Sequence, residues 1–230
     1  MSDNYTSSQT TSSIACGGGC FSFSLFPPAI AMVVGAFLLL LFGITTNPQE
    51  IPKRPNQNAA SIRSTILSPI FTQEVLYWEA SIIHWADEWK LDANLVATVM
   101  QIESCGDPMA VSGSGAIGLF QVMPYHFDKG ENAYRPNTNA ARGLTYLLLA
   151  LGKFDNDVDL ALAGYNGGIT GASRAKNLWS DEMNRYVYWG GNIFLDASQS
   201  KLSSTTLNEW LVSGGASLCK KATENIRLVD

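Results

Sequence analysis

Charged residues are missing from the first part of this sequence: Asp, Glu, Lys and Arg are all absent between Asn4 and Gln49. Over the whole chain they make up 15% of the residues, the net charge is -5, and no polybasic run occurs. A protein that binds nucleic acid needs a basic face to neutralise phosphates. We therefore expect no nucleic-acid partner.

The sequence also lacks internal repeats, the alternating apolar and polar runs of strands, and the glycine patterns of dinucleotide and P-loop sites. It does contain 46% hydrophobic residues, enough for a packed core. Apolar residues recur at helical spacing, so we expect a mostly α-helical protein in which Asp92 and Asp157 cap two of the helices. Helices are predicted over residues 74–90, 93–104, 117–122, 138–153, 158–165, 181–188 and 207–212.

An almost unbroken apolar run, LFPPAIAMVVGAFLLLLFGI, extends from Leu25 to Ile44. About 20 apolar residues match the thickness of the hydrocarbon core of a bilayer. A cleaved signal peptide would need a basic segment before the run, and the first 26 residues contain neither Lys nor Arg. We expect a single transmembrane helix over residues 25–46, which attaches the chain to the cell membrane. Lys53, Arg54 and Arg63 follow it and would by themselves favour a cytoplasmic location for what comes next.

Composition divides the rest of the chain. Residues 1–24 are rich in Ser, Thr and Gly and indicate a flexible tail. Residues 47–68 contain three prolines and little periodicity, which is typical of a linker. A globular domain is expected over residues 69–194, followed by a C-terminal extension over residues 195–230.

Four cysteines lie on both sides of the apolar run. Cys16 and Cys20 form CGGGC, which has neither the spacing nor the second ligand pair of common zinc sites, so no metal is expected. Cys105 and Cys219 would form a disulfide in an oxidising compartment if the fold brings them together, and would otherwise be two separate buried thiols.

The predicted helix over residues 93–104 is apolar and ends near a carboxylate, Glu103. A carboxyl group withdrawn from water has a raised pKa and keeps its proton near neutral pH, which is what a general acid needs. The alternative is an ordinary solvent-exposed glutamate at a helix end. Helix periodicity alone does not separate the two.

Three motifs occur in order along the chain: Glu103-Ser104, then AVSGSGAIGLFQVMP, then LALAGYNGG. Together they resemble the soluble-type lytic transglycosylases (SLT domain), relatives of goose-type lysozyme, over residues 75–193. The resemblance implies a lysozyme-like α-helical domain, here placed behind a single transmembrane helix.

The resemblance also implies roles for individual residues. Glu103 matches the single catalytic acid and base. Gly164 and Gly167 stand where the family usually has alanines, and Tyr165 could instead be a core residue with a satisfied hydroxyl. The expected substrate-binding residues are Ser112, Gln121, Met123, Tyr165 and Asn166.

The activity implied is cleavage of the β-1,4 bond between N-acetylmuramic acid and N-acetylglucosamine in peptidoglycan, with formation of 1,6-anhydro-N-acetylmuramic acid and without metal or cofactor. Asp107 and Asp128 lie near Glu103 in sequence but match no catalytic position of the family. A lysozyme-type hydrolase and a non-catalytic wall-binding protein remain as alternatives. Because peptidoglycan lies outside the membrane, the resemblance favours an extracytoplasmic domain despite the basic residues after the apolar run.

Overall fold

The computed structural model describes residues 66–227. The tail, the apolar run of residues 25–46 and most of the expected linker lie outside this part of the chain. Within residues 66–227, no helix is long and apolar enough to cross a membrane. The expected transmembrane helix therefore stays a prediction.

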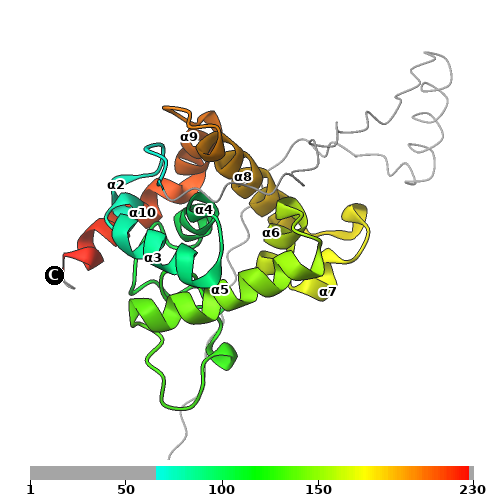
Figure 1. Ribbon diagram of the computed structural model, residues 1–230, viewed down its shortest axis with the longest axis horizontal. Coiled ribbons are helices and arrows are strands. Elements are labelled where there is room, and N and C mark those ends of the chain that lie inside the picture. Colours follow the sequence, from blue (N-terminus) through cyan, green and yellow to red (C-terminus); the bar gives the residue numbers. More distant parts are fainter. Residues whose placement is uncertain (1–65, 228–230) are drawn as a thin grey trace, which may run out of the picture. The chain divides into compact units, whose positions relative to one another are not determined.

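The described part of the chain is mostly α-helical, as predicted (Figure 1). Its β pairing consists of two isolated bridges, which join Ile117 to Val111 and to Val122. Short 3-10 helices occur at Pro124–His126 and Lys176–Leu178, and a π-helical turn at Leu211–Gly215. The α-helices are α2 (Gln73–Leu76), α3 (Glu79–Trp89), α4 (Ala93–Glu103), α5 (Pro136–Lys153), α6 (Val158–Gly167), α7 (Ile169–Ala172), α8 (Asp181–Ser198), α9 (Thr205–Trp210) and α10 (Ala216–Ile226).

Helix α4 lies among the other helices, with α2, α3 and α8 packed against it (Figure 1). Asp92 caps its N-terminus as predicted, accepting hydrogen bonds from the backbone N–H groups of Asn94 and Leu95. Every residue from Ala93 to Ile102 is buried. A helix that is covered on all sides must be mostly apolar, and its buried polar residues Asn94, Thr98 and Gln101 have hydrogen-bond partners.

Helix α6 packs between α5 and α8 and completes the core on the other side of α4 (Figure 1). Asp157 caps α6, as predicted, by accepting from the N–H of Leu160. The middle of α6 consists of small and apolar buried residues, so its neighbours approach closely. This packing places the polar C-terminal end of α6 beside α5.

Three helix predictions differ from the structure, and the simplest difference is the helix expected over residues 181–188, which continues to Ser198 as α8. The helix expected over residues 74–90 is divided into α2 and α3, because Trp78 leaves helical geometry and buries its indole, whose Nε1 donates to the carbonyl of Gly106 at 2.8 Å. The helix expected over residues 117–122 is wrong: Gly118 and Gln121 have φ values of 76° and 46°, which an α-helix does not allow. Asn139 holds this turn by donating to the carbonyl of Ile117 and accepting from the N–H of Phe120.

The C-terminal segment packs back onto the helical domain. Helix α8 continues through residue 194, where the extension was expected to begin, and α9 and α10 follow it. Thr223 of α10 donates to Glu74 Oε1 of α2 at 2.7 Å. Cys219 of α10 forms a disulfide with Cys105, with an Sγ–Sγ distance of 2.03 Å. The extension is thus covalently tied to the loop that follows α4.

This disulfide should contribute strongly to stability, because it closes a loop across a sequence separation of 114 residues. Closing a loop of about 100 residues removes denatured-state entropy equivalent to about 4 kcal/mol or more. We predict that reductant lowers the urea midpoint of the full chain in detergent. The double variant Cys105→Ser/Cys219→Ser, which retains Cys16 and Cys20, should unfold at this lower midpoint. Its midpoint should be the same with and without reductant. An unchanged wild-type midpoint after complete reduction would contradict the prediction.

Candidate active site

The candidate active site is built around Glu103, the last residue of α4. The helix stops there because the next residues, Cys105 and Gly106, have φ values of 54° and 81°. A side chain at Gly106 would also meet the carbonyl oxygen of Glu74, 2.7 Å from its Cβ, so glycine permits the close approach of α2. The chain therefore turns sharply and leaves the carboxyl group of Glu103 at the end of a buried helix, itself only partly exposed.

Tyr186 of α8 donates its hydroxyl to Glu103 Oε1 at 2.7 Å. The tyrosine is 5% exposed, so this hydrogen bond is largely shielded from water. The bond thus fixes the position of the carboxyl group.

Burial raises the pKa of Glu103 from its ordinary value of 4.5 to about 8. The hydrogen bond from Tyr186 lowers this pKa and the negative charge of Glu182 raises it, but loss of hydration is the largest effect. Burial likewise raises the pKa values of Tyr165 and Tyr186, and the charge of Glu103 adds to both. At neutral pH the site therefore holds a protonated glutamic acid and two neutral phenols.

A pocket of about 130 Å³ is lined by residues that include Gln121 and Tyr165, and Glu103 is not one of its lining residues. Tyr165, at the end of α6, connects the pocket with Glu103, because it lines the pocket and its pKa responds to the charge of Glu103. The walls come from the loop after the GLFQ segment, from α5 and from α6. Gly143 lets α5 come near, since a Cβ there would lie 2.6 Å from the Cβ of Phe120 and 3.0 Å from the Tyr165 hydroxyl oxygen.

Four of the expected substrate-binding residues meet in this pocket: Gln121, Met123, Tyr165 and Asn166. Gln121 uses its amide nitrogen on the carbonyls of Gly118 and Ala110, at 3.0 and 3.3 Å, so it also holds its own loop. The Tyr165 hydroxyl donates to the carbonyl of Phe120 at 2.7 Å, so the ring both lines the pocket and supports the fold.

Ser112 stands apart from the pocket walls. Its hydroxyl accepts from the N–H of Ala116 at 3.0 Å and is hydrogen-bonded to the Ser114 hydroxyl at the same distance. These bonds stabilise the small-residue loop that follows Glu103. Only the resemblance in sequence grouped Ser112 with the four expected substrate-binding residues that line the pocket.

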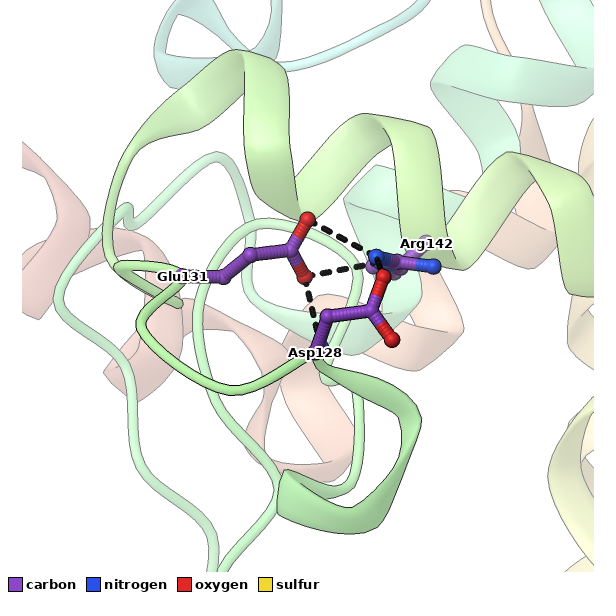
Figure 2. A network of polar contacts seen from close by, with 3 residues as sticks. All are labelled: Asp128, Glu131 and Arg142. Atoms are coloured by element: carbon purple, nitrogen blue, oxygen red, sulfur yellow. Dashed lines mark hydrogen bonds and ion pairs between the residues drawn. The ribbon is translucent and has the colours of Figure 1, made fainter.

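Asp107 and Asp128, the two acids near Glu103 in sequence, have other partners. Asp107 is buried and accepts from the N–H of Met109 and from the side-chain amide of Asn225. Asp128 is paired with Arg142, which also binds Glu131 through its Nε at 2.9 Å and Nη2 at 2.8 Å (Figure 2). Both acids therefore have structural roles in the described part of the chain.

Sequence reasoning missed several residues of the site. Tyr186 lies in a predicted helix, but no local pattern shows that it faces an acid 83 residues earlier. Arg142 was hidden in the same way, since its partners lie in a loop without periodicity. The aromatic pocket residues that were missed are Tyr125, His126 and Tyr146.

Within the described residues, one group of possible metal ligands was found: Glu74, Cys105 and Cys219. The two cysteines are joined in the disulfide, so their sulfur atoms are not free thiolates. This cluster is therefore a structural crosslink with a neighbouring carboxylate.

Comparisons with known proteins found a family model, similar sequences and a solved structure that resemble parts of this chain. Residues 80–185 match the family described as Transglycosylase SLT domain. A "Transglycosylase" of Enterobacteria phage PRD1 is 39% identical over 100 residues, which cover 43% of this chain and 37% of the relative. "Membrane-bound lytic murein transglycosylase E" of Buchnera aphidicola is 30% identical over 139 residues, which cover 53% of this chain and 58% of the relative. The structure of lytic transglycosylase Slt from Pseudomonas aeruginosa aligns with 53% of this chain and 24% of its own, at 21% identity and a TM-score of 0.44.

Residues 80–185, slightly less than half of the chain, resemble the Transglycosylase SLT domain. The chain spans 37% and 58% of the lengths of the phage and Buchnera relatives.

Proposed function

We propose that this chain is a peptidoglycan lytic transglycosylase that cleaves the β-1,4 bond between N-acetylmuramic acid and N-acetylglucosamine. One observation carries the proposal: burial raises the pKa of Glu103 to about 8, so it keeps its proton at neutral pH, and its charge acts on Tyr165, which lines a pocket of family-typical residues. The SLT match extends from α3 to the start of α8, and it supports a lysozyme-like arrangement for this helical domain.

In the first step, the protonated carboxyl group of Glu103 donates its proton to the glycosidic oxygen, and the bond to C1 of the muramic acid breaks. The acetamido carbonyl of the same sugar stabilises the positive charge that develops at C1. Tyr186 keeps its hydrogen bond to Oε1 and stabilises the carboxylate that forms. Burial keeps Glu103 protonated until the substrate is in place, because the weakly hydrated carboxylate is disfavoured.

In the second step, ionised Glu103 accepts the proton of the C6 hydroxyl of the muramic acid. That oxygen attacks C1 and closes the 1,6-anhydro ring, and Glu103 returns to its protonated form. A carboxyl group with a pKa of about 8 is a stronger base than an ordinary glutamate and suits this step as well. One group thus acts as acid and then as base.

The surroundings of Glu103 favour this reaction over hydrolysis. Glycosidases that use water commonly need a second carboxylate, as nucleophile or as base. Asp107 and Asp128 are engaged in the fold, and Glu182 affects Glu103 through its charge from the first turn of α8. In the alternative of a lysozyme-type hydrolase, water attacks in place of the C6 hydroxyl, and Glu182 is the candidate for a second carboxylate because its charge acts on Glu103.

We also propose that residues 25–46 anchor the enzyme in the cell membrane with the domain outside the cytoplasm. The length of the apolar run supports this, as do relatives named membrane-bound lytic murein transglycosylases. The pairing of Cys105 with Cys219 adds support, since disulfides persist in oxidising compartments. Protease added to intact spheroplasts should digest the domain; if the domain were digested only after lysis, the orientation would be the reverse.

The main prediction concerns the products released from purified murein. The wild-type chain should release 1,6-anhydromuropeptides, and Glu103→Gln should lower the rate at least about a thousandfold, because the amide has no acidic proton to transfer. Mass spectrometry separates anhydro products from reducing-end products by one water molecule.

Two further substitutions make this test selective. Glu88→Gln changes an exposed acid on α3 and should cleave like the wild type. Glu182→Gln should still release anhydro products. If the protein were a hydrolase that uses Glu182 as its second carboxylate, the wild type would release reducing-end products and Glu182→Gln would lose activity. Unchanged cleavage by Glu103→Gln would refute the assigned chemistry.

A further inference from the structure

Four aromatic rings follow one another along the pocket, from the deepest wall to the surface. Tyr165 contacts Tyr146 at a centroid distance of 5.9 Å, Tyr146 contacts His126 at 5.2 Å, and His126 contacts Tyr125 at 4.5 Å. All four line the pocket, although they come from α6, from α5 and from the 3-10 helix Pro124–His126. The row begins at the residue that adjoins Glu103 and ends in solvent.

The outer end of this row is unusually exposed for aromatic side chains. Tyr125 is 75% exposed, and His126 is exposed beside it. Single exposed rings are common on protein surfaces, but a row that continues from a pocket marks a surface suited to a ligand. The contacts between the rings fix their relative orientation before any ligand arrives.

A three-residue 3-10 helix has little stability of its own, so the outer rings need an external support. Arg142 of α5 supplies it by binding Glu131 and Asp128, which lie in the loop just after Tyr125 and His126 (Figure 2). Glu131 also accepts from the N–H of Asp128 at 2.8 Å, so the loop is closed on itself and on α5. Tyr146 follows Arg142 by one helical turn, so the support and an inner ring share a face of α5.

The charges around the row favour a neutral ligand. Arg142 lines the pocket, but two carboxylates already balance it, and its pairing lowers the pKa of Glu131. Lys129, in the same loop, does not line the pocket. An anionic group would therefore meet no unbalanced cation among these residues. A pyranose ring instead offers an apolar face of C–H groups to aromatic rings and polar edges to the amide of Asn166 and the ring of His126.

We propose that Tyr125, His126 and Tyr146 form a stacking platform for a neutral N-acetylhexosamine unit of the glycan strand, and that Arg142 is the positioning residue that holds it. This inference rests on the proposed function, because it assigns to the row a sugar beyond the bond that Glu103 cleaves. The platform lengthens the glycan site from Tyr165 outward. The loop after the GLFQ segment thereby helps to hold the glycan strand.

Binding can be measured apart from cleavage by calorimetric titration of the full-length Glu103→Gln chain in detergent with the tetramer of N-acetylglucosamine. In that background, Tyr125→Ala should weaken binding about three- to tenfold, the effect of losing one aromatic contact. Tyr125→Phe should retain most of the affinity, since it keeps the ring. Tyr134→Ala removes an exposed tyrosine of the same region outside the pocket and should bind like the parent.

The role of Arg142 has its own readout. Arg142→Lys keeps the charge but loses the two-point binding of Glu131, so it should weaken tetramer binding by a similar factor. If Arg142 acts through the platform, adding Tyr125→Ala to Arg142→Lys should cost little more, whereas a general structural defect would make the two losses multiply. Far-ultraviolet circular dichroism of each variant checks that the helices are intact.

The outcomes separate this inference from the proposed function. Parent-like tetramer binding by Tyr125→Ala would overturn the platform even if the wild type releases anhydromuropeptides. Weaker binding by Tyr125→Ala in a chain whose wild type cleaves no murein would leave the platform in place and refute the enzyme. If Tyr125→Ala weakens binding of stem peptides but not of the tetramer, the row binds the peptide and the proposal is wrong.

Discussion

The removal of one carboxyl group from water is the constraint on which the rest of this site depends. Glu103 can be buried only because α4 is enclosed by its neighbours and because Cys105 and Gly106 turn the chain away immediately after it. The cost of desolvation appears as a pKa raised to about 8, and Tyr186 offsets part of it through a shielded hydrogen bond. An acid placed in this way keeps its proton at neutral pH and gives it up only when a substrate supplies an acceptor.

The remainder of the domain supports this arrangement from two sides. The disulfide between Cys105 and Cys219 fixes the loop after Glu103 to α10, so the C-terminal extension stabilises the backbone next to the acid. On the other side, Arg142 ties the loop around Asp128 and Glu131 to α5 and shapes the pocket wall (Figure 2). Both are long-range constraints on segments that have no regular structure of their own.

The sequence predicted what local rules determine. The caps at Asp92 and Asp157 and the apolar stripe of α5 gave three helices nearly correctly, and the motif around Glu103 located the acid. It failed where tertiary contacts override periodicity, as at Trp78, whose indole leaves the helix to bind Gly106, and at the turn around Gly118. Tyr186 and Arg142 could not be found in this way, because their roles depend on partners distant in sequence. The pairing of Cys105 with Cys219 was left open for the same reason.

The most direct test of this account is the ionisation of Glu103 itself. In a full-length chain labelled with ¹³C at the glutamate side-chain carboxyl, the Glu103 resonance can be assigned by its absence from Glu103→Gln and followed through a pH titration. The account predicts a midpoint near 8, well above that of the exposed glutamates. A midpoint near the ordinary value of 4.5 would mean that Glu103 is ionised at neutral pH and would contradict its role as the proton donor.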